Sequence, residues 1–274
     1  MLAAVLHRLR VVYRKVGDTR FISHLDLTNA FNRALRRAEI PVAYTEGFSP
    51  RPRSAFGPPL PLFVEGEREL ADAELAEPFD VADFIARMNG VLPEGIAILE
   101  GGYVSMKASS ITASIRQAGY RVEPREGDWD VTAERIAELL ARPEIVITKE
   151  SKGQKKTVDI RPAIVALTLE GHAVVAQVEA SPQRTLNVFD LMGALVPGFT
   201  AAESARFRVV RTGFIVEEAP AANPLLASAG CPPIPSLPKS IPAASCPASC
   251  RRCARCATCC PTPRSGRSRR CRWW

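Results

Sequence analysis

Two spacings of hydrophobic residues follow each other near the start of the chain. Apolar and basic residues nearly alternate over 8–16, which is typical of a half-buried strand. From residue 23 the spacing lengthens to three or four positions, in a stripe that begins at Leu27, and this predicts a helix. Ser23 with Asp26 three positions later fits an N-cap and capping box, and Pro41 ends the helix.

The hydrophobic pattern of the remaining sequence predicts two similar halves. In the first, a second helix capped by Asp80 and strands at 42–46, 69–77 and 95–104 complete the ferredoxin-like order β-α-β-β-α-β. The second shows strands at 113–123, 144–151, 158–170, 172–180 and 207–216, and helices at 132–141 and 187–196. It has one strand more between its helices. We therefore predict an α+β protein of two tandem ferredoxin-like units packed together, residues 1–108 and 109–218.

The last segment, residues 219–274, has no sustained hydrophobic period. It is rich in proline, alanine, arginine and cysteine, so we predict a disordered tail, and an off-frame read of GC-rich DNA would give the same composition. Cys246, Cys250 and Cys253 have the spacing of a radical SAM cluster motif, but too little chain follows to build a barrel around a cluster. We expect no metal site and no cofactor.

Charge and cysteine content separate this tail from the body. The chain carries a net charge of +7, and residues 219–274 hold eight arginines, one lysine and no acid, so residues 1–218 carry −2. A nearly neutral body is no evidence of nucleic-acid binding by itself. The first 230 residues contain no cysteine, and the apolar start is too short for a signal peptide or a membrane span. We predict a cytoplasmic protein without a membrane partner.

The stretch EGFSPRPRSAFGPPLP, residues 46–61, is here called the arm. Its five prolines fix backbone angles and remove donors, so we expect a stiff connection that adds no strand to a sheet. Arg51 and Arg53 share a parity and are predicted to project together toward a phosphate or carboxylate, with Phe48 and Phe56 holding the ends of the arm on the core. Alternatively, the arm only covers a sheet edge and its arginines are solvated.

Two further sets of cations are candidates for anion binding. Arg20 and His24 flank the start of the first helix, where free N–H groups favour an anion, although His24 could pack on the sheet and Arg20 could pair with an acid. The second set lies on or beside a predicted hairpin and either tracks a phosphate backbone or protects a strand edge: Lys149, Lys152, Lys155, Lys156 and Arg161.

The acidic residues of the predicted strand around 65–74 alternate along the sequence. Glu65, Glu67 and Glu69 share one parity, and Asp72 and Glu74 share another, so each set would lie on one strand face. Such a pattern could hold a metal, but we interpret it as a solvated face.

Two motifs carry a family resemblance. The run FISHLD at 21–26 and the run GFSPRPR at 47–53 closely resemble the radical SAM-linked protein family, a bacterial domain of unknown function, and the resemblance covers most of residues 8–217. Members are fused to, or encoded beside, a radical SAM protein, often near genes for RNA processing. The architecture also resembles, more weakly, the CRISPR repeat-processing endoribonucleases, which are tandem ferredoxin-like proteins that cleave RNA without metal.

Three functions follow as hypotheses. The first is an accessory binding module that acts with a radical SAM enzyme and presents an anionic substrate, RNA, to it. The second is a metal-independent endoribonuclease that uses His24 as its catalytic residue. The third is a structural partner domain without a ligand.

Overall fold

The computed structural model describes residues 6–127, 129–151, 154–201 and 206–217. These residues belong to one compact unit of the chain. The predicted tail, all eight cysteines and Lys152 lie outside the described residues. No helix within the described ranges is both long and apolar enough to cross a membrane.

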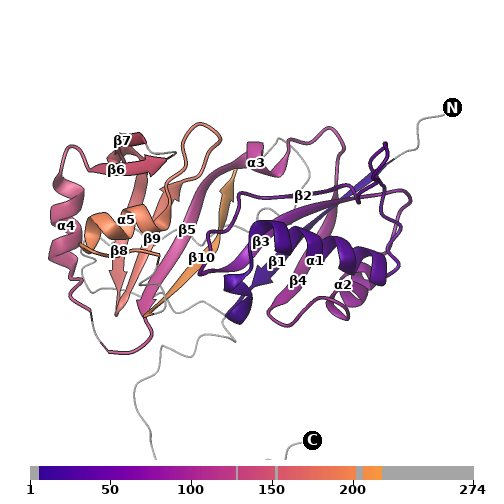
Figure 1. Cartoon of the computed structure of the whole chain (residues 1–274), viewed down its shortest axis with the longest axis horizontal. Helices are drawn as coiled ribbons and strands as arrows, with labels where there is room; N and C mark the ends of the chain where they lie inside the picture. The colour runs from indigo at the N-terminus through magenta and orange to yellow at the C-terminus, as the bar shows by residue number, and fades with distance from the viewer. Residues whose placement is uncertain (1–5, 128, 152–153, 202–205, 218–274) are drawn as a thin grey trace, which may run out of the picture. The chain divides into compact units, whose positions relative to one another are not determined.

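The first half is a sheet covered by helices on one face (Figure 1). Antiparallel strands follow the order β4-β1-β3, and β2 pairs with β3 on the side away from β1. In chain order the elements are β1 (His7–Lys15), η1 (Gly17–Phe21), α1 (His24–Arg37), β2 (Ser54–Phe56), β3 (Val64–Leu75), α2 (Val81–Asn89) and β4 (Ile96–Val104).

Helices α1 and α2 begin where the sequence predicts. The Ser23 hydroxyl accepts from the backbone N–H of Asp26 at 3.1 Å, and the Asp80 carboxylate accepts from that of Asp83 at 2.8 Å. Phe31 of α1 and Phe84 of α2 are fully buried in one cluster with the strand residues Leu9 and Ala73. These apolar stripes therefore fix the helices on one face of β1, β3 and β4, while Val12, Val64 and Leu70 of β1 and β3 are buried in a second cluster.

The second strand of the first half was wrongly predicted. Residues 42–46 make only isolated bridges, between Val42 and Leu75 and between Tyr44 and Pro52. The strand is instead β2, inside the arm, where Ser54 and Phe56 pair with Ala73 and Ala71. Prolines do prevent ladder pairing over most of the arm, but Arg53–Phe56 contain none and keep their N–H donors.

The second half contributes four strands to the large sheet and carries a separate hairpin. Its strands follow the order β10-β5-β9-β8, and β6 and β7 form a separate two-stranded sheet. The elements are α3 (Ile111–Ser114), β5 (Ile115–Pro124), α4 (Ala133–Ala141), β6 (Val146–Ser151), β7 (Gln154–Asp159), η2 (Arg161–Ala163), β8 (Ile164–Glu170), β9 (Ala173–Glu179), α5 (Val188–Leu195) and β10 (Phe207–Val216).

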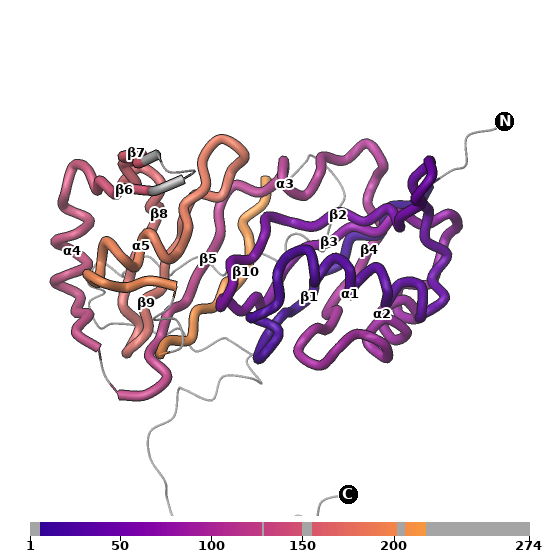
Figure 2. The backbone as a smooth tube through the Cα atoms, in the orientation of Figure 1, coloured from indigo at the N-terminus to yellow at the C-terminus, as the bar shows by residue number. Residues whose placement is uncertain are grey.

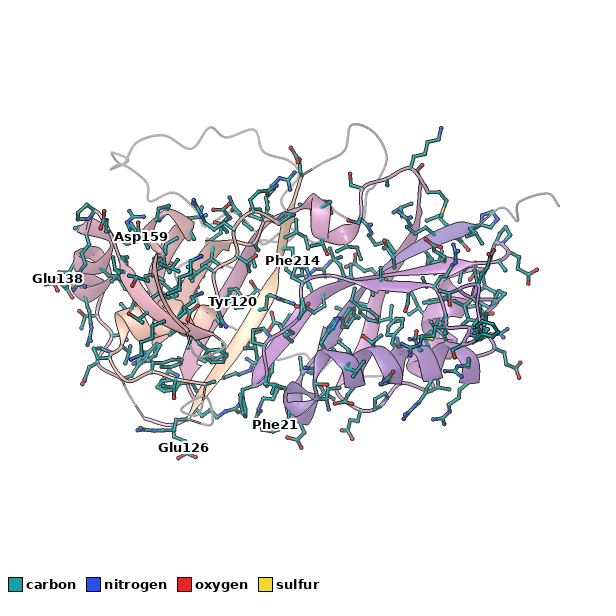
Figure 3. All side chains as sticks on the ribbon, turned by 45° about the horizontal axis from the view of Figure 1, so that its top comes forward. Phe21, Tyr120, Glu126, Glu138, Asp159 and Phe214 are labelled. Atoms are coloured by element: carbon teal, nitrogen blue, oxygen red, sulfur yellow. The ribbon has the colours of Figure 1, made fainter. Side chains whose placement is uncertain are left out.

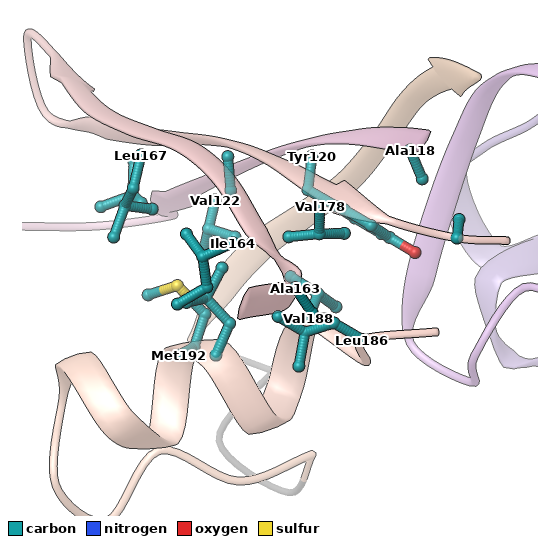
Figure 4. Close-up of a cluster of buried hydrophobic side chains, with 14 of the residues drawn as sticks. Ala118, Tyr120, Val122, Ala163, Ile164, Leu167, Val178, Leu186, Val188 and Met192 are labelled. Atoms are coloured by element: carbon teal, nitrogen blue, oxygen red, sulfur yellow. The ribbon is translucent and has the colours of Figure 1, made fainter. Parts of the chain in front are cut away.

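Pro162 explains a second correction to the predicted strands. The stretch 158–170 reads as one strand in sequence, but η2 divides it into the end of β7 and the whole of β8. Proline favours a short turn of helix at its N-terminal positions and cannot donate to a sheet ladder. Beyond this break, Ile164 and Leu167 pack with Val178 and Met192 in the core beneath the sheet (Figure 4).

One sheet runs through both halves. Strand β10 returns from the second half to lie beside β3, and Val209 and Arg211 pair in parallel with Val64 and Gly66 (Figure 2). Strand β10 thus pairs with the beginning of β3, and β2 pairs with its end, on the same side. The result is a mixed α+β fold with a large sheet of eight strands and few helices.

Candidate anion-binding site

The base of the arm is tied to the sheet by backbone hydrogen bonds. The N–H of Arg53 donates to Ala43 O at 2.7 Å, and the N–H of Glu74 donates to Arg53 O at 2.9 Å. The Ser54 hydroxyl donates to Asn32 Oδ1 of α1 at 3.0 Å. Arg53 is therefore held in a fixed position beside β3. The neighbouring prolines add to this rigidity because they restrict the backbone angles.

A pocket of about 450 Å³ lies against this part of the arm. Here it is called the arm pocket, and its walls include Arg8, Thr45, Arg53, Asp72, Glu74 and Ser110. Arg8 Nη2 donates to Glu74 Oε1 at 3.4 Å, and Arg53 Nη1 donates to Glu74 Oε2 at 3.2 Å. Two guanidinium groups from different elements thus share a single carboxylate.

A buried ion pair supports the arm pocket. Arg10 donates to both oxygens of Asp72, at 2.7 and 2.8 Å, and both residues are less than 5% exposed. Both oxygens of Asp72 are used in this bidentate pair. The Asp72 carboxylate therefore does not neutralise a second arginine. Arg8, Arg10 and Arg53 together with Asp72 and Glu74 give a net charge of +1, and Arg8 and Arg53 share the single carboxylate of Glu74.

The two arginines of the arm have different surroundings. Arg53 lines the arm pocket, whereas Arg51 is exposed, and no ion pair of its guanidinium is found among the described residues. Phe48 is wrongly predicted, because its ring is fully exposed and holds nothing on the core. Phe56 does pack inward, with its ring centroid 5.3 Å from that of Phe31 and 6.2 Å from that of Tyr13.

Arg20 lies in a second group of charges at the beginning of β3. Its Nη1 is 3.6 Å from Glu65 Oε1, and Arg208 Nε donates to Glu65 Oε2 at 3.1 Å. Arg125 also approaches this carboxylate, with its Nη2 at 3.9 Å from Oε1. Glu65 is only 5% exposed, so these arginines serve first to neutralise a buried charge.

His24 lies over a buried ionic cluster where the two halves meet. Lys15 is 1% exposed and donates to the carbonyl of Ile22 at 3.1 Å, just before α1. Burial lowers the pKa of Lys15, and the carboxylate of Glu69 partly offsets this effect. Burial would also lower the pKa of Arg211, but the charge of Glu69 outweighs it and holds that pKa above its usual value.

Burial lowers the pKa of His24 as well, and the positive charges of Lys15 and Arg211 lower it further. The imidazole is therefore neutral at pH 7. Its ring meets Phe56 at 5.8 Å between centroids, and within the described ranges no hydrogen bond to the ring is found. A neutral imidazole can act as a base, but a catalytic role also needs a reacting group within reach.

This lowered pKa predicts a loss of stability in mild acid. The unfolded chain binds a proton at His24 near pH 6.5, before the folded chain does, so protonation favours unfolding as the pH falls below that value. We expect the free energy of unfolding to decrease as the pH falls below about 6.5, and His24→Gln to reduce this decrease. Ring proton chemical shifts measured against pH check the cause. A His24 midpoint at or above the usual histidine pKa of 6.5 would contradict it.

The basic hairpin has a mixed environment. Lys149 Nζ lies 2.6 Å from Asp190 Oδ2 of α5, and Arg161 Nε donates to Leu140 O at 3.1 Å, so both have structural contacts. Lys155 and Lys156 are exposed on β7. Lys152 lies outside the described residues, and the hairpin shares no residue with the arm pocket.

The acidic residues of β3 were wrongly interpreted as a solvated face at three of five positions, whereas Glu67 is exposed as expected. Glu65, Glu69 and Asp72 are buried, and each is paired with arginine from another element. Across the described ranges, no group of three His, Cys, Asp or Glu side chains is placed to hold a metal ion. Sequence reasoning also missed Arg8 as a site residue, although the alternation Arg8-Leu9-Arg10 already placed two arginines on one strand face.

These features define a mixed α+β protein with an arginine-lined pocket beside a stiff arm. The family described as "Uncharacterized protein conserved in bacteria (DUF2344)" matches residues 8–188, and the chain belongs to this family. The match includes the arm, Arg8 and Arg53.

A search of curated proteins gives no match. Among solved structures, the chain is similar to one in "Crystal Structure of a Cbf5-Nop10-Gar1 Complex", with 11% sequence identity and a TM-score of 0.38. The alignment covers 76% of this chain and 49% of that chain, so this chain spans about half of its length.

Proposed function

We propose that this protein is an accessory binding module that holds RNA through a phosphate in the arm pocket. The observation that carries the proposal is that Arg8 and Arg53 share Glu74 at the wall of a pocket of about 450 Å³. Volumes of roughly 300–1,000 Å³ are usual for small-ligand sites, so a phosphate with part of its nucleotide fits.

The electrostatics of the arm pocket support an anionic ligand. One carboxylate cannot satisfy the donors of two guanidinium groups, and the Arg53 side chain is still 39% exposed. A phosphate that accepts hydrogen bonds from both arginines gains two charge-assisted contacts. Because the arm is already held by its backbone bonds and prolines, little ordering entropy opposes binding.

The strand orders support the interpretation of each half as a ferredoxin-like unit. The orders β4-β1-β3-β2 and β10-β5-β9-β8 are equivalent once the β6–β7 hairpin is treated as an insertion. On this interpretation residues 1–108 and 109–218 are two units whose sheets join at β3 and β10. The arm then belongs to the first unit alone.

The partner is proposed on the resemblance carried by FISHLD and GFSPRPR. We infer a radical SAM enzyme that performs the chemistry while this chain holds the substrate. Affinity capture of the full chain from its native host, followed by mass spectrometry, is expected to recover such an enzyme. Capture that recovers RNA but no radical SAM enzyme would contradict the partner and leave the binding role standing.

RNA binding is tested by Arg8→Ala/Arg53→Ala in the full chain. Hydrogen bonds to charged groups contribute about 1.5–3 kcal/mol and exposed ones less, so we expect roughly tenfold weaker binding of a labelled single-stranded RNA. The log–log slope of affinity against salt should become shallower by about one to two. Fluorescence anisotropy at several salt concentrations measures both quantities.

The matched control is Arg33→Ala/Arg37→Ala on the exposed face of α1. This control removes the same two positive charges and retains residues 219–274. A general electrostatic effect on RNA affinity should therefore be equal in the two double variants. We expect affinity within about twofold of the parent for this control. Equal losses in both double variants would show non-specific attraction and sink the proposed site, provided that both variants unfold at the parent temperature.

A further inference from the structure

The tip of the arm exposes an aromatic ring without any packing contact to explain it. Phe48 is fully exposed, whereas the other phenylalanine of the arm, Phe56, lies against Phe31 and His24. A phenylalanine in water forgoes the stabilisation that burial of its ring would bring. The fold therefore gives no structural reason for an aromatic residue at position 48.

The backbone that carries Phe48 is nevertheless well held. Thr45 N–H donates to Arg51 O at 2.9 Å, and Arg51 N–H donates to Thr45 Oγ1 at 3.0 Å, so residues 46–50 form a closed tip. Gly47 has a φ of 120°, which permits the turn, and Pro50 and Pro52 restrict the returning strand. The ring is thus presented from a fixed base.

The tip and its base expose further side chains besides Phe48. Tyr44, at the base of the tip, is 44% exposed, and the exposed Arg51 closes the tip opposite Thr45. The tip carries one carboxylate, Glu46, which disfavours phosphate there. On this inference the arginines of the arm pocket attract the phosphate, and the tip contributes the aromatic face of Phe48. Bases of every type have a π-face that stacks on such a ring.

We infer that Phe48 stacks on an unpaired base, so that the arm binds single-stranded rather than duplex RNA. This inference rests on the proposed function, since the adjoining phosphate is held by Arg8 and Arg53. A base within a duplex is already stacked between its neighbours and does not reach a ring on a loop tip. The ligand class is therefore an RNA loop, end or linker with at least one accessible base.

The experiment compares Phe48→Ala, Phe48→Leu and Phe48→Trp in the full chain. The probes are a labelled single-stranded RNA of about 12 nucleotides, the same strand in a duplex, and an abasic strand of equal length. We expect Phe48→Ala and Phe48→Leu to weaken single-strand binding by roughly tenfold, because leucine retains apolar area but lacks a π-face. Phe48→Trp should bind like the parent, and its added fluorescence should be quenched by RNA.

Each other outcome overturns the inference in a distinguishable way. If Phe48→Leu binds like the parent, the contact is apolar rather than stacking. Equal losses on the abasic strand also exclude a base as the partner of the ring. If Arg8→Ala/Arg53→Ala weakens binding and Phe48→Ala does not, the stacking role is wrong and the proposed function stands. If the parent protein binds no RNA, the stacking role and the proposed function are both wrong. If Phe48→Ala still binds RNA but no longer captures a protein that the parent captures, the ring contacts a protein partner instead.

Discussion

Replacing Arg211 with methionine is expected to lower the free energy of unfolding by about 3–5 kcal/mol. The Nε of Arg211 donates to Glu69 Oε1 at 2.7 Å, and both side chains are only 3% exposed. Methionine retains much of the volume but leaves the Glu69 carboxylate buried without the guanidinium that donates to both of its oxygens. Urea unfolding followed by circular dichroism measures the difference.

The same variant also removes a contact that holds the end of the arm. Arg211 Nη2 donates to Pro58 O at 2.8 Å, and its guanidinium lies 4.5 Å from the centre of the Phe214 ring. Figure 3 shows Phe214 and Tyr120 near the boundary between the two halves, where β10 and β5 run side by side. We therefore expect Arg211→Met to loosen the arm as well as the joint between the halves.

Two comparisons separate the buried pair from a general loss of charge. Arg184→Met removes the pair of Arg184 with Glu179 on the surface, where the arginine side chain is 52% exposed, and should cost less than about 1 kcal/mol. Arg211→Met/Glu69→Leu removes both charges of the pair and should recover part of the lost stability, but not all of it, because the buried Lys15 then loses its acidic neighbour. A loss below about 1 kcal/mol for Arg211→Met alone would contradict the role of this pair.

Gly66→Ala is expected to cost about 1–3 kcal/mol, and to act through Glu69. A Cβ at position 66 would lie 2.6 Å from Cγ and 2.7 Å from Oε1 of that glutamate. The glutamate cannot simply turn away, because Arg211 donates to both of its carboxylate oxygens. Either the backbone of β3 shifts, or the ion pair between the halves is broken.

A double-mutant cycle tests this mechanism. Once Glu69→Ala has removed the obstructing side chain, Gly66→Ala should cost much less, so the two changes should be clearly non-additive. Gly57→Ala is the matched control, because its Cβ would meet Ile111 and Leu70 at an ordinary 3.5 Å. Strict additivity of the two losses in urea unfolding would show that the strain at position 66 has another source.

The helices could be predicted from the sequence because their determinants are local. Ser23 and Asp80 cap their helices through residues three positions away, and the stripe of Leu27 and Phe31 repeats within one helix. The ends of β1, β4 and β9 also follow from alternation that is bounded by turns. Such features depend on neighbours in the chain, which the sequence shows directly.

The partners of the charged residues could not be predicted because they are distant in sequence. Arg211 and Glu69 are 142 positions apart, and Arg10 and Asp72 are 62 apart. Alternation predicted neither the buried environment of Glu65, Glu69 and Asp72 nor the shift in the register of β1 and β3 between Gly66 and Glu69, which interrupts the alternation. These acids are paired because β1 and β10 lie beside β3 and bring arginines to them. That neighbourhood depends on the order of strands in the sheet.

The candidate site was predicted in part for the same reason. The arm and Arg53 were found from composition and parity, both of which are local. Arg8 joins the arm pocket only because β1 pairs with β3 and brings Arg8 opposite Glu74. The exposure of Phe48 was not predicted, because the turn that carries it depends on the hydrogen bonds between Thr45 and Arg51.

Photocrosslinking tests the central claim, that the arm of this protein binds RNA, most directly. The full chain is irradiated with single-stranded RNA that contains a photoreactive uridine, at an ionic strength of about 0.15 M to screen weak surface attraction. Mass spectrometry then maps the linked peptides. We predict crosslinks in the arm at residues 46–56, strongest at Phe48 and weakened in Arg8→Ala/Arg53→Ala. Crosslinks confined to residues 219–274, or none at all, would contradict the account.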